Sequence, residues 1–307
     1  MKLAELEPRV LLSRSEMEGG CLSADTIRRA ADSLRGYGYV VIASADPTRA
    51  VVSSSLCAEC ATLSAKRLDN HLELVSAATS KDPRAGAFTF AEICMRSDRS
   101  LRYDLTLSQR GRPPTEWRSL FKEADRVSQQ LLSSASILAL AQGSDEPRPC
   151  GAARKRKAWD GEAVISMYGC VISEPGAPNQ GFHRDGAAHG AWNIFVPLVD
   201  VDCINGATQF QPGSHRLEDV RFDVDDSELF TPKVHAGDLL IFDYRTVHRG
   251  LANRSLARRP IAYIVRSERR AVDRHNFPPR SLHEMVMLRK SIGALEAKIG
   301  RLGSPSS

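Results

Sequence analysis

Beyond residue 160, short apolar runs separated by glycine, proline and asparagine dominate the sequence. The runs are residues 163–173, 191–199, 207–211, 232–235, 238–243 and 260–266. Runs of this length and spacing are typical of strands in a double-sheet jelly roll or a related sandwich. Helix-like patterns dominate the chain before residue 160. The sequence therefore predicts an α+β fold, with helices packed on one side of a β core.

The first part of the chain alternates helical and strand-like patterns. Ser23 can cap a helix whose apolar residues recur at helical spacing and which Gly36 and Gly38 end. We expect a strand at 39–42, a helix over about 47–68, a linker over 72–86, strand-like structure over 88–107 and a helix over about 115–140. A final helix should present an apolar seam made by Met285, Leu288, Ile292, Leu295, Ile299 and Leu302. The seam fits a homodimer and docking onto the protein's own body equally well.

Composition excludes several classes of protein. The chain has 307 residues, 42% of them hydrophobic, and no apolar run long enough to span a bilayer. Its first residues lack the continuous apolar core of a secretory signal, so we expect a cytoplasmic protein without a membrane partner. The basic run Arg154–Lys157 reads as a solvated surface insertion within the 144–160 loop, with nuclear import as the alternative.

The cysteines do not indicate a disulfide framework or a thiol site. There are seven, an odd number, scattered along the chain. Cys57 and Cys60 form a lone C-x-x-C inside a predicted helix, without the second pair that a zinc site would need.

The segment Gln180-Gly181-Phe182-His183-Arg184-Asp185 carries the strongest chemical signal. In extended chain, residues i and i+2 point to the same side, so His183 and Asp185 can meet one metal ion. His248 follows the apolar run 239–243 and can return beside them in an antiparallel barrel. Two imidazoles and one carboxylate on one face of an octahedron leave positions open, as in non-haem Fe(II) oxygenases.

An arginine completes this pattern. If 2-oxoglutarate chelates the iron, its far carboxylate needs a cation, and the planar fork of arginine binds a carboxylate in a bidentate manner. Arg259 begins the apolar run 260–265, and the neighbouring Arg258 should face the opposite side of that strand. Only one of the two should therefore enter the pocket.

These motifs resemble the phytanoyl-CoA dioxygenase family of Fe(II)/2-oxoglutarate-dependent oxygenases. The resemblance rests on QGFHRD at 180–185, NGATQFQPGSHR at 205–216, GDLLIFDYRTVHRG at 237–250 and NRSLARRP at 253–260. It implies a double-stranded β-helix, which is a cupin-like jelly roll, with an N-terminal helical layer and a C-terminal helix. The resemblance covers about 162–267 well, and the length of the chain favours a single dioxygenase domain over 1–307. Within it, 1–160 would be the helical layer and substrate mouth, 161–268 the catalytic core and 269–307 a helical extension.

The resemblance assigns roles to individual residues. His183, Asp185 and His248 would bind Fe(II) and serve as the catalytic centre. Arg259 would anchor 2-oxoglutarate, with Gln180 and Thr208 as further polar contacts, and His215 would be structural. Phe195 can wall the co-substrate pocket, and a mouth built from Arg96, Arg99, Arg102 and Tyr103 would suit an anionic substrate. One departure is Gly250, two residues after the distal histidine, where the founding phytanoyl-CoA enzymes carry a hydroxyl residue.

The expected activity is hydroxylation of an unactivated C–H bond in a small organic molecule, using 2-oxoglutarate and O₂ and releasing succinate and CO₂. Asp185 favours hydroxylation because halogenases of this fold replace that carboxylate by a small residue. Three alternatives stay open: an oxygenase that modifies a protein or nucleic acid, a non-catalytic β-sandwich binding module, and a zinc hydrolase that needs no O₂. We do not expect nucleic acid as a partner.

Overall fold

The computed structural model describes residues 8–109, 111–133, 164–187, 189–218, 225–267 and 280–302. The predicted basic loop, including Arg154–Lys157, lies outside these residues. Within the described ranges, no helix is long and apolar enough to cross a membrane.

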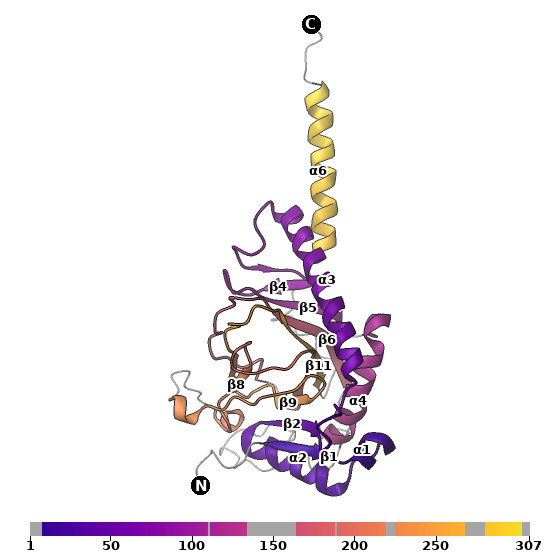
Figure 1. The fold of residues 1–307 in the computed structure, drawn as a ribbon. Coiled ribbons are helices and arrows are strands. Elements are labelled where there is room, and N and C mark those ends of the chain that lie inside the picture. Colours follow the sequence, from indigo (N-terminus) through magenta and orange to yellow (C-terminus); the bar gives the residue numbers. More distant parts are fainter. Residues whose placement is uncertain are drawn as a thin grey trace, which may run out of the picture.

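A large, mainly antiparallel sheet forms the centre of the molecule (Figure 1). In the described part of the chain it has nine strands in the order β1-β2-β9-β7-β11-β6-β5-β4-β3, and β1 and β2 pair in parallel. The strands are β1 (Arg9–Leu12), β2 (Tyr39–Ser44), β3 (Phe88–Thr89), β4 (Ile93–Met95), β5 (Arg102–Gln109), β6 (Val164–Ser173), β7 (Ala191–Pro197), β9 (Leu239–Asp243) and β11 (Arg259–Ser267). The α+β fold with a large antiparallel sheet is thereby confirmed.

A second, smaller sheet faces the first. It pairs β8 (Thr208–Phe210) with β10 (His248–Gly250) in antiparallel fashion. Isolated antiparallel bridges extend the pairing, including one between His183 and His248. The sequence prediction missed β10 as a strand because it has only three residues and begins at a histidine.

The large sheet recruits strands from both halves of the chain. β1 to β5 come from residues before 161, which the sequence indicated as a helical layer and substrate mouth, yet they hydrogen-bond into the same sheet as β6, β7, β9 and β11. β2 pairs with β9, and β5 pairs with β6. The two halves therefore share one sheet.

Helices cover the face of the large sheet that lies away from the small sheet (Figure 1). They are α2 (Ala24–Tyr37), α3 (Ser54–Thr79) and α4 (Arg118–Leu132), preceded by the short α1 (Arg14–Gly19) and the 3₁₀ turn η2 (Thr115–Trp117). Ser23 caps α2 through a hydrogen bond from the Thr26 amide, and Gly38 ends it with a φ of 82°. The predicted helix after Ser23 is confirmed, although it continues past Gly36.

Helix α3 differs from the helix that was predicted over about 47–68. It begins at Ser54 and continues to Thr79, so the linker expected over 72–86 is wrong for its first part. Leu72, Val75 and Ala78 lie on the buried face and extend the apolar stripe that packs on the sheet. Cys57 and Cys60 are free thiols buried in the same stripe.

Strand alternation sorts side chains between the helices and the small sheet. On β7, Trp192, Ile194 and Val196 enter the core beneath the helices. Asn193 and Phe195 face the other way and line a cavity between the sheets. Phe195 therefore lies where the sequence analysis placed it, in the wall of a cavity.

The last helix, α6 (Leu282–Leu302), projects from the body (Figure 1). Leu282 and Val286 are buried at its base, where α6 contacts α3. Leu288, Ile292 and Leu295 are exposed, so this part of the seam does not dock onto the body of the same chain.

Candidate metal and co-substrate site

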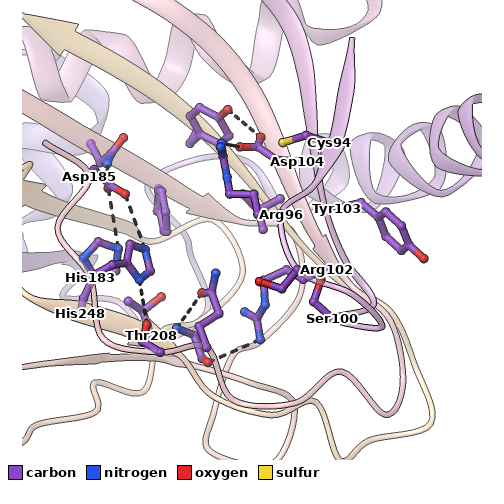
Figure 2. Close-up of a pocket in the computed structure, with 18 of the residues that line it drawn as sticks. Cys94, Arg96, Ser100, Arg102, Tyr103, Asp104, His183, Asp185, Thr208 and His248 are labelled. Atoms are coloured by element: carbon purple, nitrogen blue, oxygen red, sulfur yellow. Dashed lines mark hydrogen bonds and ion pairs between the residues drawn. The ribbon is translucent and has the colours of Figure 1, made fainter. Parts of the chain in front are cut away.

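Three side chains converge at one end of the cavity. His183 and Asp185 lie in the segment between β6 and β7, and His248 begins β10. Main-chain hydrogen bonds of 3.0 Å in both directions join His183 to His248, so the two imidazoles lie side by side. One potential ligand atom from each of the three residues lies within 4.8 Å of the other two. The sequence-predicted trio is therefore brought together (Figure 2).

The main chain orients both imidazoles in the same way. Nδ1 of His183 lies 3.0 Å from the carbonyl oxygen of Gly181, and Nδ1 of His248 lies 3.0 Å from that of Thr246. Each Nδ1–H can therefore donate to the carbonyl two residues earlier, which leaves the lone pair on Nε2. Each Nε2 lies 3.7 Å from an oxygen of Asp185. Burial lowers the pKa of His248, which favours the neutral imidazole that binds a metal.

Asn193 positions the carboxylate of Asp185. Its Nδ2 donates a 2.5 Å hydrogen bond to Oδ2 of Asp185 from strand β7. The sequence analysis assigned no role to Asn193. The available signal was an amide in the middle of an otherwise apolar strand.

Two buried arginines, Arg102 and Arg259, line the same cavity; the region around them is called the co-substrate end below. Arg259 on β11 and Arg102 on β5 are both in register with Ser173 on the intervening strand β6. Nη2 of Arg102 donates to the carbonyl of Leu251 at 2.9 Å. Nε of each arginine is buried without a hydrogen-bond partner.

Burial leaves this pair of cations in need of an anion. Burial and, to a smaller extent, the nearby Arg102 together lower the pKa of Arg259 to about 9. Burial lowers the pKa of Arg102 to about 10. Among the described residues, neither arginine forms an ion pair with a carboxylate. A carboxylate of a ligand would supply the missing charge and hydrogen-bond acceptors.

The side chains of Arg258 and Arg259 lie on opposite sides of the large sheet. Arg258 lies on the outer side and forms ion pairs with Asp69 at 2.7 Å and Glu174 at 2.8 Å. Arg259 is buried and lines the cavity, whereas Arg258 does not belong to its lining.

Gly250 leaves the space that Arg102 occupies. A Cβ atom at this position would overlap Nη1 of Arg102 and lie 2.7 Å from Oε1 of Gln180. Gln180 is fixed by a 2.9 Å hydrogen bond from the amide of Gly250, and Thr208 is opposite Gly250 in the small sheet. A residue larger than glycine at position 250, such as the hydroxyl residue of the founding enzymes, would therefore clash with Arg102 as it reaches the site from β5.

The cavity has a volume of about 460 Å³, within the range of small-molecule sites. Its lining includes the predicted residues His183, Asp185, His248, Arg259, Gln180, Thr208, Phe195, Arg96, Arg102 and Tyr103. His215 is buried outside it, next to Gly38 and Thr246.

The predicted arginine-rich mouth is not assembled as expected. Arg99 is absent from the cavity lining. The ring of Tyr103 points away from the other labelled side chains (Figure 2) and packs near Phe88 in the core, because Tyr103 lies on the opposite face of β5 from Arg102. Arg102 lies at the co-substrate end instead, and Arg96 is paired with Asp104.

The donor set fits a divalent iron site. Two neutral imidazoles and one carboxylate are the ligands of the facial triad, and among the described residues no cysteine belongs to this cluster. The two buried guanidiniums fit the far carboxylate of a dicarboxylate such as 2-oxoglutarate. Together, the jelly-roll fold and this donor set define a protein with a non-haem metal centre at the mouth of a β core.

Comparison with known families gives the identity of the class. The family model described as phytanoyl-CoA dioxygenase matches residues 34–261. The chain belongs to the phytanoyl-CoA dioxygenase family.

Curated relatives match a shorter part of the chain. Dioxygenase hkm4 of Aspergillus hancockii is 32% identical over 111 residues, which cover 33% of this chain and 36% of that protein. The iron/alpha-ketoglutarate-dependent dioxygenase ausU of Aspergillus calidoustus is 32% identical over 90 residues, 25% of this chain and 30% of that protein. The chain thus spans about a third of the length of these relatives.

Solved structures show a more distant likeness. The non-haem alpha-ketoglutarate-dependent epimerase SnoN from nogalamycin biosynthesis is 19% identical, with a TM-score of 0.44. The comparison covers 80% of this chain and 82% of that one.

Proposed function

We propose that this protein is a non-haem Fe(II)- and 2-oxoglutarate-dependent dioxygenase that hydroxylates a C–H bond of a small organic substrate. The observation that carries the proposal is the convergence of His183, Asp185 and His248 beside a buried guanidinium. Membership of the phytanoyl-CoA dioxygenase family supports it. We further propose that residues 1–307 act as one dioxygenase domain, because strands from both halves share the large sheet.

In this proposal, each group of residues has a separate task. His183, Asp185 and His248 hold the metal through Nε2 and carboxylate oxygens, and Asn193 keeps the carboxylate of Asp185 in place. Arg259 and Arg102 bind the far carboxylate of 2-oxoglutarate, while Gln180, Thr208 and Phe195 wall its site. When bound there, iron would supply the oxidising power for inserting one oxygen atom of O₂ into a C–H bond, while the other oxygen atom enters succinate and 2-oxoglutarate loses CO₂.

Cavity size favours a small molecule over a macromolecule as the substrate. A space of about 460 Å³ between the two sheets holds a co-substrate and part of a small organic molecule. A protein or nucleic-acid oxygenase would instead need a broad groove. Asp185 takes the ligand position that a halide would need, so hydroxylation is the expected outcome.

Succinate release tests this function. The full chain should convert 2-oxoglutarate to succinate only when Fe(II) and O₂ are both present. Arg259→Leu should lose this turnover, and Arg258→Leu is the matched control, because its side chain lies outside the cavity. A binding module would release no succinate. A zinc hydrolase would work without O₂.

A further inference from the structure

The wall of the cavity formed by β5, β6 and β11 carries a polar cluster that neither the metal nor the co-substrate uses. Asp104 on β5 is its centre. The hydroxyl of Tyr263 donates to Oδ1 of Asp104 at 2.8 Å, and Nη2 of Arg96 lies 3.3 Å from Oδ2. Figure 2 shows Arg96 directed at Asp104, on the side of the cavity away from His183 and His248.

The backbone is adapted to this cluster. Tyr263 lies on β11 and Asp104 on β5, and β6 runs between these two strands. Tyr263 is in register with Gly169 of β6, and a Cβ atom at Gly169 would overlap the phenol. The ring therefore crosses the intervening strand where that strand has no side chain. A contact that depends on a glycine in mid-strand is a built feature of the wall.

The charge of this wall disfavours an anionic substrate. Arg102 is committed to the co-substrate end, and Arg184 donates to the carbonyls of Ser214 and Leu217. Within the described cavity lining, Arg96 is the remaining arginine, and it is paired with Asp104. Met167, Val171 and Val265 supply apolar surface nearby. An uncharged, largely apolar molecule fits this lining.

Asp104 has capacity for a further hydrogen bond. An ionised carboxylate offers about four acceptor positions, of which Tyr263 and Arg96 use two. Its side chain is 16% exposed, so solvent has little access to the rest. Burial raises the pKa of Asp104, and an added donor would offset that cost.

We propose that Asp104 is the specificity-determining acceptor of this enzyme: it receives a hydrogen bond from a hydroxyl or amide N–H of an uncharged, mainly apolar substrate. That bond fixes which carbon of the substrate faces the metal end. The inference rests on the proposed dioxygenase function, since it names the substrate class of the same cavity.

Binding of matched probes tests the inference without turnover. The full chain is loaded with Zn(II) and 2-oxoglutarate in the absence of O₂. Dissociation constants are then measured by calorimetry for 2-decalol, its methyl ether and decalin-2-carboxylate. The alcohol should bind about tenfold or more tightly than the other two, which is the worth of one hydrogen bond to a charged acceptor. Asp104→Leu should reduce this preference to less than about twofold, again on the scale of one such bond.

The matched control is Asp98→Asn, which removes the same charge from the cavity rim without touching Tyr263 and should keep the preference. Equal binding of alcohol and ether, tightest binding of the carboxylate, no binding of the alcohol, or an unchanged preference in Asp104→Leu would each overturn the inference. Binding of 2-oxoglutarate to the zinc-loaded protein is measured first and separates the two proposals. If 2-oxoglutarate does not bind, the proposed function fails. If it binds equally to wild type and Asp104→Leu while the alcohol preference is missing, only the inference fails.

Discussion

Arg258 and Arg259, adjacent residues at the start of β11, have opposite surroundings. Arg258 has two carboxylate partners on the outside of the sheet, whereas Arg259 is buried next to a second guanidinium. A buried cation without an anion is costly, and such a cost is offset when a ligand supplies the counter-charge. The burial of Arg259 without an anionic partner among the described residues therefore indicates that its ligand is negatively charged.

We predict that Arg259→Leu weakens binding of 2-oxoglutarate by about 2–5 kcal/mol, because a buried charged hydrogen-bond partner is lost. Arg258→Leu should leave the affinity within about twofold, which is well under 1 kcal/mol. Calorimetric titration of the metal-loaded protein measures both. Equal effects of the two substitutions would mean that the strand does not sort the arginines as described.

The pKa of Arg259 predicts a pH limit for co-substrate binding. Burial lowers this pKa to about 9 in the free protein, and a bound carboxylate favours the protonated form. Affinity for 2-oxoglutarate should therefore be fully present below about pH 9 and fall as the pH rises through that value. Titrations from pH 7 to 10 check it, and an affinity that rises over this interval would contradict the assignment.

Asn193 should act on the metal through Asp185. We predict that Asn193→Ala lowers metal affinity about 10- to 100-fold, the usual effect of removing a group that orients a ligand. Competition with a chelator measures the affinity, and thermal unfolding of the metal-free protein serves as the control. A loss of thermal stability with unchanged metal affinity would show that Asn193 only packs.

At the scale of elements, Gly169 couples three strands. We predict that Gly169→Ala destabilises the protein by about 1–3 kcal/mol, because the added methyl overlaps the ring of Tyr263. Replacing Tyr263 by Leu in the same protein should recover part of this loss, since the overlap disappears. Urea unfolding of the two single variants and the double variant gives the coupling energy, and strictly additive effects would disprove the contact.

Glu16 joins two helix starts. Its Oε2 accepts from the amide of Ser13, which caps α1, and its Oε1 accepts from the amide of Ser23, which caps α2. Burial alone would raise its pKa, but hydrogen bonds from Thr26, Ser23 and Ser13 outweigh burial and lower it to about 2. A lowered pKa stabilises the folded state above the pKa of the unfolded chain, and the contribution is lost as pH falls toward the folded value.

Glu16→Gln should therefore cost about 1–2 kcal/mol at neutral pH, the usual scale for a lost helix cap. The difference from wild type should shrink as the pH falls from about 4.5 towards 2. Denaturant unfolding at several pH values measures it. Glu18→Gln, on the exposed side of the same helix, is the control, and a difference that grows in acid would contradict the sign.

The parts of the site that could be predicted from sequence are those set by alternation within a single strand. His183 and Asp185 are two residues apart, and Arg259 differs from Arg258 only by strand alternation, so both follow from local periodicity. Asn193 meets Asp185, and Tyr263 meets Asp104, only when the chain has folded into the sheet, which no short motif encodes. Tyr103 and Arg102 were grouped by composition, although alternation along β5 separates them.

At the scale of the whole molecule, α6 projects away from the body (Figure 1). The homodimer through the C-terminal helix stays a prediction, since one chain shows only that Leu288, Ile292 and Leu295 are exposed. If the seam joins two copies, the full chain should sediment as a dimer, and the variant with all three residues changed to Gln should be monomeric. A monomeric wild type at micromolar concentration would contradict the dimer.

The account as a whole depends on one metal centre that also binds 2-oxoglutarate. Its most direct test is an anaerobic titration of the full chain with Fe(II) and then 2-oxoglutarate, followed by the visible charge-transfer absorption of an iron-bound 2-oxo acid. We predict one iron per chain and an absorption band that appears only after 2-oxoglutarate is added, and that is lost in His183→Ala and His248→Ala. A band that survives in both variants, or a wild type that binds no iron, would contradict the central claim.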